Sequence, residues 1–387
     1  MSRILVLLIL LILYGSLYPW DFRFHPLAES PLRILLRAWP RSIDRWEARD
    51  IVVNILLYVP LGAAATLALA QKAGALARRL LPLLLGLSLS TAIELLQIFD
   101  RGRTASACDI ACNFAGTAAG VWLAAAFSPQ IHALLERRRS EWRSAPGAFL
   151  LLILWAAGQV YPFFPALGRY AFLAKLRALL HSPPGATELL GAAAGWLTVA
   201  MLSEALFGRD RAPRFFILLL LLLPARLLIA GNGLRLADLA GAAAAAGLWR
   251  LLPREPSARY RTMAVFLVAS LAVRGFAPFH LVREHARFNW IPFANLLEWD
   301  WLRGGVILFR KAFDYGSAVW MVEAAGAGYV TAAALVATLL GAIEVVQLRL
   351  PGRSPEITDP ILAVLLAWVL WLLERDRPAR KNSAGFR

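Results

Sequence analysis

Residues 93–113, which read IELLQIFDRGRTASACDIACN, form a strongly polar break between two long apolar runs. Glu94 and Gln97 are three positions apart, so they share one face of a helix, and Asp109 and Asn113, four apart, share another. The connection between the two pairs is short. We therefore expect a tight helical hairpin that brings all four side chains to the same depth, with Arg103 near its tip.

The composition predicts a membrane protein. Hydrophobic residues make up 59% of the chain, against about 45–50% in an ordinary soluble domain. Several apolar runs are long enough to cross a hydrocarbon core about 30 Å thick. They are continuous and lack the apolar–polar alternation of membrane strands. The expected fold is an all-α polytopic transmembrane helical bundle whose first partner is the lipid bilayer of the cell membrane.

Twelve apolar runs are candidate spans, the first of them interpreted as an uncleaved span although it resembles a signal peptide. They are 4–19, 50–70, 79–98, 107–127, 147–163, 187–207, 214–230, 236–252, 262–278, 304–323, 328–348 and 357–373. The run 304–323 is the weakest, because it carries Arg310, Lys311 and Asp314.

Basic clusters give the expected orientation. With twelve spans, four clusters fall on one side: 136–143, 208–214, 254–261 and 374–381. The positive-inside rule makes that side cytoplasmic, with both termini, although the opposite segment 20–49 also carries arginines. Three longer segments then lie at the outer face, as short amphipathic pieces in the interface or as plain loops: 20–49, 164–186 and 279–303. The net charge of +16 fits basic loops at a membrane surface, and without a nucleic-acid motif we expect no nucleic-acid partner.

The polar hairpin recurs. Residues 90–109 align without a gap on 340–359, and the seven identities are mostly polar, which hydrophobic bias does not produce. The principal pairs are Glu94 with Glu344, Gln97 with Gln347, Gly102 with Gly352, Arg103 with Arg353, and Asp109 with Asp359.

A degenerate middle copy lies at 219–238. It keeps Gly231 and Asp238 at the positions of the repeated Gly and Asp, whereas Leu223, Arg226 and Asn232 replace the Glu, Gln and Arg. The twelve spans then divide into three parallel four-helix repeats. Their expected ranges are 1–140, 141–255 and 256–387.

The candidate site consists of polar residues expected near the outer surface, since ionisable residues inside a membrane are functional candidates. Asn54 joins it from the start of the second span, and Lys311 holds the related place before Tyr315, as Asn54 does before Tyr58. The full set is Asn54, Glu94, Gln97, Arg103, Asp109, Asn113, Lys311, Glu344, Gln347, Arg353 and Asp359.

A purely structural role remains open for these residues. Ser106 and Asp109 fit a capping box, and Glu94 is placed to pair with Arg103. In the third copy Ser354 and Pro355 resemble an N-cap and first helical residue. That start would place Asp359 one turn further in, where it cannot be the same cap.

Other features point away from metal and cofactor chemistry. The histidines show no metal-ligand spacing, and the chain has no phosphate loop, nucleophile elbow or dinucleotide fingerprint. Cys108 and Cys112 suggest no disulfide framework. We predict no metal and no cofactor. Gly116 and Gly120 form a small-residue face suited to close helix packing.

Three segments together resemble the VanZ-like family of membrane proteins: DIVVNILLYVPLG (50–62), ELLQIF (94–99) and GRTASACDIACNFAGTAAG (102–120). The resemblance is good over 50–120 and weaker over 304–373, where Ala363 replaces the Asn. It implies membrane embedding and a link to the bacterial cell envelope. The family's namesake is associated with resistance to glycopeptide antibiotics such as teicoplanin, and the resemblance implies no enzymatic activity.

Three functions stay open. The leading hypothesis is an envelope protein that binds a glycan, a lipid-linked sugar, a cell-wall precursor or an amphiphilic antibiotic at the polar patch, with Arg103 and Arg353 contacting anionic groups. The second is an enzyme acting on a lipid-linked envelope precursor, with Glu94 or Asp109 as general acid or base. The third is a secondary transporter, against which stand the four-helix repeat and polar residues near one surface.

Overall fold

A computed structural model of the chain describes most of its residues. The described ranges are 2–18, 20–24, 26–40, 45–69, 73–100, 103–137, 145–162, 168–181, 183–283, 285–294, 296 and 301–375. Arg101, at the tip of the expected hairpin, lies outside them.

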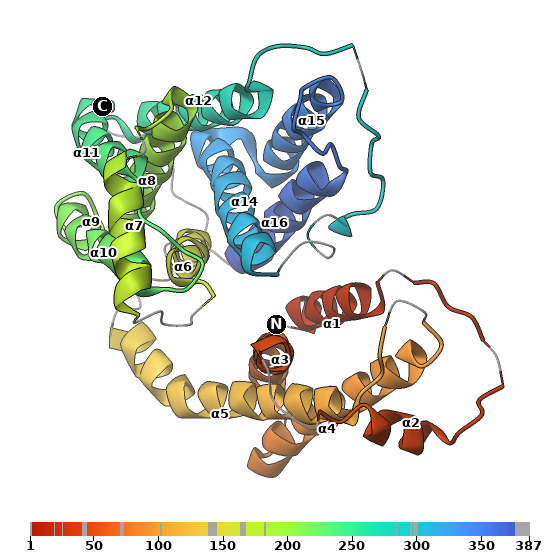
Figure 1. Ribbon diagram of the computed structural model, residues 1–387. Helices are drawn as coiled ribbons and strands as arrows, with labels where there is room; N and C mark the ends of the chain where they lie inside the picture. Colours follow the sequence, from red (N-terminus) through yellow and green to blue (C-terminus); the bar gives the residue numbers. More distant parts are fainter. Residues whose placement is uncertain are drawn as a thin grey trace. The chain divides into compact units, whose positions relative to one another are not determined.

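The described residues confirm the all-α prediction. They form helices and connections, and no β-strand occurs among them apart from two isolated bridges. The chain divides into two compact units, Met1–Arg137 and Arg138–Arg387 (Figure 1). The second unit contains the ranges expected for the second and third repeats.

The described residues of unit 1 form four long helices and one short one. The long helices are α1 (Ser2–Leu17), α3 (Arg45–Leu69), α4 (Ala75–Gln97) and α5 (Ala107–Arg137). The short helix α2 (Pro31–Arg37) lies within the connection between α1 and α3. α4 and α5 form the expected hairpin, and α3 continues through Pro60.

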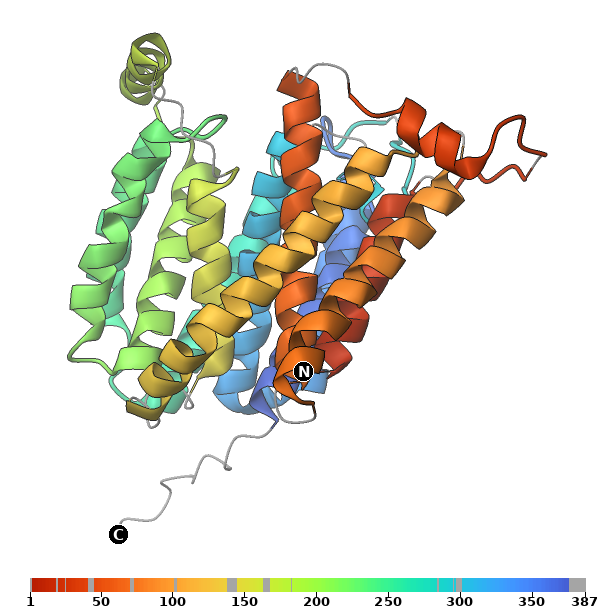
Figure 2. The same ribbon diagram turned by 90° about the horizontal axis from the view of Figure 1, so that it is seen from below.

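Unit 2 opens with α6 (Pro146–Val160), the short helix α7 (Arg169–His181), α8 (Ala186–Phe207) and α11 (Leu236–Leu251). Between α8 and α11 the chain forms α9 (Ala212–Leu220), α10 (Leu222–Ala225) and the 3₁₀ turn η2 (Arg226–Leu228). The unit ends with α12 (Pro256–Phe276), α14 (Trp301–Val322), the π-helical turn η3 (Glu323–Ala327), α15 (Tyr329–Gln347) and α16 (Thr358–Glu374). Figure 2 shows its long helices running side by side along one direction.

Five described helical stretches are long and apolar enough to cross a membrane by length and composition: Asp50–Leu69, Leu76–Gln97, Ala107–Ala126, Ala186–Phe207 and Tyr329–Gln347. Ile4–Leu17 and Pro146–Val160 are shorter apolar helices. These helices indicate a membrane protein, and the total of twelve spans stays a prediction.

The structure corrects two of the predicted spans. The run 214–230 is not one helix, because Pro224 has no N–H to donate to the carbonyl of Leu220, and the chain breaks into α9, α10 and η2 there. The run 262–278 begins earlier, at Pro256, because Glu255 caps α12 by accepting the N–H groups of Ser257 and Ala258. The hydrogen bond from the Ser257 hydroxyl, followed by that from the Ala258 N–H, lowers the pKa of Glu255 below its ordinary value.

Short helices occupy two of the three segments expected at the outer face. α2 lies within 20–49 and α7 within 164–186. Seen lengthwise in Figure 1 and end-on in Figure 2, α7 runs across the direction of the long helices of unit 2. Lys175 attaches it to the unit by donating to the carbonyls of Leu227, at 3.1 Å, and Ile229.

Backbone-to-backbone packing joins α3 to α5, and it confirms the predicted role of Gly116 and Gly120. A Cβ atom at Gly116 would collide with the carbonyl oxygen of Ile55, and one at Gly120 with that of Val59. Facing them, a Cβ at Gly62 would collide with the carbonyl of Thr117. Glycines on both helices therefore permit this close approach.

Two buried polar clusters tie the helices of unit 2 together. Arg259 is 2% exposed and pairs with Glu204 at 2.8 Å, and Trp249 donates to the same carboxylate at 2.8 Å. Glu374 accepts hydrogen bonds from the N–H of Gly147 at 3.1 Å, the indole of Trp320 at 2.9 Å and the hydroxyl of Tyr329 at 2.5 Å.

Substituting Gly116 tests the α3–α5 contact. We expect Gly116→Leu to destabilise the protein by about 3 kcal/mol, the upper end for overpacking, because the obstructing atom belongs to the backbone of α3. The neighbouring residue Ala115 is exposed, so Ala115→Leu is the matched control. Thermal unfolding of the full chain in detergent measures both, and equal midpoints for the two variants would contradict the packing.

Candidate functional site

Glu94 closes the hairpin between α4 and α5. Its carboxylate, 3% exposed, accepts the N–H of Ser106 at 2.8 Å, and the Ser106 hydroxyl accepts the N–H of Cys108 at 3.1 Å. The predicted capping box is therefore only half correct. In a capping box Asp109 would accept the N–H of Ser106, but Glu94 of the neighbouring helix accepts it. Asp109 bonds to Asn54 instead.

Gln97 and Arg103 bind the end of α1. The Gln97 amide donates to the carbonyl of Ser16 at 2.7 Å, and Arg103 donates to those of Tyr18 at 2.7 Å and Gly15 at 3.0 Å. The last carbonyls of a helix have no partner within it, and in an apolar environment each one needs a donor. Arg103 thus supplies hydrogen-bond donors to the carbonyls at the end of α1. The structural alternative, in which Arg103 pairs with Glu94, had not predicted this contact.

Unit 2 contains the same set of contacts. Glu344 accepts the N–H of Glu356 at 2.9 Å, and Gln347 donates to the carbonyl of Gly275 at 3.1 Å. Arg353 donates to the carbonyl of Ala277 at 2.7 Å and to that of Arg274 at 3.0 Å. We call each such set of a Glu, a Gln and an Arg a clamp. One clamp holds α1 and the other holds α12.

The backbone beyond the clamped helices also follows one path. Arg23 donates its N–H to the carbonyl of Phe99 at 2.8 Å, and Val282 donates to that of Arg349 at 2.8 Å. Trp20 and Phe279 both have positive φ, 62° and 65°. A positive φ is uncommon for an aromatic residue. Its occurrence three residues after the end of both α1 and α12 therefore supports a shared backbone path.

The start of α16 differs from the prediction. The helix begins at Thr358 after an Ile357 N-cap, and Ser354 and Pro355 precede it. Asn289 holds this stretch away from the helix by donating to the carbonyl of Pro355 at 3.0 Å and accepting from the N–H of Ile357 at 3.0 Å. Asp359 therefore lies in the first turn, as Asp109 does in α5.

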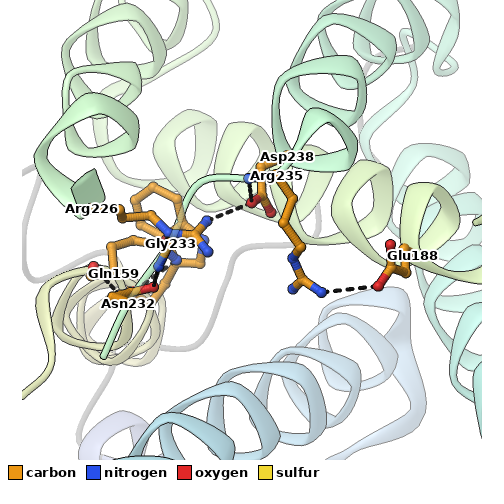
Figure 3. Close-up of polar contacts among 8 residues, drawn as sticks. Gln159, Glu188, Arg226, Asn232, Gly233, Arg235 and Asp238 are labelled. Carbon is orange, nitrogen blue, oxygen red and sulfur yellow. Dashed lines mark hydrogen bonds and ion pairs between the residues drawn. The ribbon is translucent and has the colours of Figure 1, made fainter. Parts of the chain in front are cut away.

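The middle copy retains one element of the clamp. Asn232 stands where the repeat has Arg, and its amide donates to the carbonyl of Gln159, near the end of α6, at 2.7 Å (Figure 3). Arg226, in place of the Gln, pairs with Asp238 at 2.9 Å. Gly231 and Gly352, aligned in sequence, have φ of 68° and 70°.

The repeated aspartates have matching partners. Asp109 bonds to Asn54, whereas Asp359 binds Lys311 at 2.5 Å and accepts the hydroxyl of Tyr315. Asn54 and Lys311 are the two residues that the sequence placed at related positions. The fourth residue of the first hairpin, Asn113, donates to Ser90 on α4 at 2.9 Å and so bridges α4 and α5.

A cavity of about 590 Å³ lies within unit 2. It is lined where α6, α12 and α15 end and where α8, α11, α14 and α16 begin. Its wall contains every predicted site residue of this unit: Lys311, Glu344, Gln347, Arg353 and Asp359. The predicted residues Asn54, Glu94, Gln97, Arg103, Asp109 and Asn113 belong to unit 1.

Several cavity residues were not predicted. Arg274 pairs with Asp314 at 2.8 Å and Arg235 with Glu188 at 3.0 Å (Figure 3 shows the latter pair), and Arg310 lines the same cavity. The signal for Arg310 and Asp314 was present in the charges of the weakest span, 304–323. Within the described ranges, no group of three His, Cys, Asp or Glu residues is placed to hold a metal ion.

Comparison with known families bears on the first unit. Residues 3–128 match the family model described as VanZ/LLP1. This segment is VanZ-like. The VanZ-like segment contains the first clamp and all the predicted site residues of unit 1, and with the apolar helices it indicates a membrane protein. Neither curated proteins nor solved structures gave a match to the chain.

Substituting Lys311 tests whether its contact with Asp359 is equivalent to the contact between Asn54 and Asp109 in the VanZ-like segment. We expect Lys311→Asn to keep a thermal midpoint near that of the wild type, because Asn54 serves the corresponding aspartate. Lys311→Leu should cost about 3 kcal/mol, since it leaves the buried Asp359 with neither a cation nor a hydrogen-bond donor at this position. Both are measured by thermal unfolding of the full chain in detergent, and equal losses in the two variants would contradict the equivalence.

Proposed function

We propose that the chain is an integral membrane protein of three VanZ-like four-helix repeats, 1–140, 141–255 and 256–387, with twelve spans. Its cavity binds the polar head of a lipid-linked envelope sugar. The observation that carries the proposal is the cavity itself, because it brings together residues of the second and third proposed repeats, including Asn232, Gln347 and Asp359.

The matching contacts support the repeat. The two complete clamps use aligned residues to bind the same end of the first helix of a repeat, α1 or α12. The middle copy binds the end of α6 through Asn232 alone. Chance similarity between apolar helices does not account for shared polar contacts and for shared positive φ at aligned glycines.

The lining of the cavity suits a sugar attached to a lipid. Its volume lies in the range of about 300–1,000 Å³ that is typical of ligand pockets. Aromatic rings of Trp155, Phe309 and Phe313 line it beside amide and charged groups such as Gln159 and Asn232. Stacking surfaces together with hydrogen-bonding groups fit an amphiphilic ligand better than an apolar one.

The position of the cavity also favours such a ligand. It lies at the end of the bundle that the distribution of basic clusters places at the outer face, with the termini in the cytoplasm. Lipid-linked sugars used in envelope assembly are available there. The ligand would enter among helix ends, and it would not need the midplane site that is typical of secondary transporters.

Binding explains the site better than catalysis does. Glu344 and Asp359 both line the cavity. However, Asp359 also holds Lys311 and Tyr315, and Glu344 holds the N–H of Glu356. Carboxyl groups engaged in this way are suited to shaping the wall, whereas a general acid or base must reach the reacting atom. The clamps likewise commit Arg103 and Arg353 to backbone carbonyls.

Filling the cavity tests the proposal. Ser354 is exposed and lines the cavity, so Ser354→Trp should occupy it without disturbing the core. With the full chain in nanodiscs and a fluorescent polyprenyl-phosphate monosaccharide as probe, we expect wild-type binding and about a tenfold loss in this variant, or about 1.4 kcal/mol. Ser88→Trp, at an exposed serine of α4, is the matched control and should bind like the wild type. No binding by the wild type, or equal binding by Ser354→Trp, would contradict the proposal.

A further inference from the structure

We infer that the cavity of unit 2 binds a head group that carries a negative charge, and that Arg310 is the residue that contacts that charge. The inference rests on the proposed function, because it specifies the chemistry of the ligand bound in the same cavity. It also replaces Arg103 and Arg353, the arginines that the sequence suggested for this role.

The basic and acidic side chains that line the cavity are equal in number. Six basic side chains face it: Arg226, Arg235, Arg274, Arg310, Lys311 and Arg353. Six acidic side chains also line it: Glu188, Asp238, Asp314, Glu344, Glu356 and Asp359. The two sets are equal in number, so a basic side chain without an acidic partner is a candidate for contact with a bound anion.

Most of these charged side chains already have a partner in an ion pair or a hydrogen bond. Three arginines each have one acidic partner: Arg226 with Asp238, Arg235 with Glu188, and Arg274 with Asp314. Lys311 lies 2.5 Å from Asp359 and 3.6 Å from Glu356. Among the described residues Arg353 forms no ion pair, but carbonyl oxygens accept hydrogen bonds from its guanidinium group. Of the six basic side chains, Arg310 is the one for which the described residues supply neither an ion pair nor a hydrogen-bond acceptor.

Arg310 is the exception in this wall. Within the described part of the chain it makes no hydrogen bond and no ion pair, and its side chain is exposed where it lines the cavity. Surrounding protein nevertheless removes part of its hydration, and its charge interacts with the like charges of Arg274 and Arg235 as well as with Asp314. A partly desolvated guanidinium that has no hydrogen-bond acceptor favours a bound anion.

The guanidinium also determines which anions fit. Its planar set of donors matches two oxygens of a phosphate or a carboxylate at once. A phosphodiester carries one negative charge, as does a fatty-acid carboxylate, and both groups occur on membrane amphiphiles. The phosphate that links a sugar to its lipid belongs to the same class, so the charge of the proposed ligand would sit at Arg310.

Lipid binding by charge-altered variants tests the assignment. The full chain in detergent is titrated by native mass spectrometry with three probes: phosphatidylglycerol, a phosphodiester of one negative charge; palmitate, a carboxylate; and diacylglycerol, a neutral lipid. We expect Arg310→Gln to lower the affinity for phosphatidylglycerol by about tenfold or more, because a charge-assisted hydrogen bond is lost. Arg310→Lys should retain part of the affinity, since it keeps the charge without the paired donors. Arg250→Gln, at an exposed arginine of α11 away from the cavity, should bind like the wild type.

The outcomes separate this inference from the proposed function. Preferential wild-type binding of phosphatidylglycerol, lost in Arg310→Gln, supports the inference with a phosphate head. The same pattern with palmitate supports it with a carboxylate. Equal binding of diacylglycerol, or an affinity unchanged in Arg310→Gln, overturns the inference while the cavity remains a binding site. If Ser354→Trp leaves binding of every probe unchanged, the cavity is not the site and both fail.

Discussion

The carbonyl groups at the ends of apolar helices impose the constraint on which this structure depends. Each helix ends with carbonyls that have no partner within the helix, and membrane surroundings offer few donors. The protein satisfies them with side chains from a hairpin distant in sequence: Gln97 and Arg103 for α1, Gln347 and Arg353 for α12. A glutamate at the start of each clamp fixes the hairpin by accepting an N–H across it.

The cavity lies beside the incomplete clamp of the middle copy, whose residues Arg226, Asn232 and Asp238 line it. The middle copy has Asn232 in place of an arginine, and this shorter side chain donates to a carbonyl near the end of α6, whereas the apolar Leu223 replaces the glutamate. Arg226 is then available to pair with Asp238 in the cavity wall. Two complete clamps bind the ends of α1 and α12, and the cavity lies beside the charged first half of α14.

Sequence patterns predicted the helices and the repeated polar residues, because apolar runs and recurring charges are local properties of the chain. They did not predict what those residues contact. Arg103 was a candidate for anion binding, yet its partners are carbonyls more than eighty positions earlier, which no spacing reveals. In the sequence Arg310 served only to mark the run 304–323 as a weak span. Its proposed role depends on which neighbouring acidic residues already form ion pairs. Pro224 is present in the sequence, but the surrounding residues are apolar, so the run 214–230 was predicted as one span and the helix break there was not.

The orientation of the three repeats is the central claim, and cysteine accessibility in intact cells tests it most directly. Single cysteines are placed in a chain whose two native cysteines are replaced by alanine, and are treated with a membrane-impermeant maleimide. Parallel repeats predict labelling at exposed positions of all three outer segments: Arg33, Arg177 and Arg287. They predict protection at exposed positions of the cytoplasmic connections: Arg79, Arg211 and Arg254. Labelling that changes side from one repeat to the next would contradict the account.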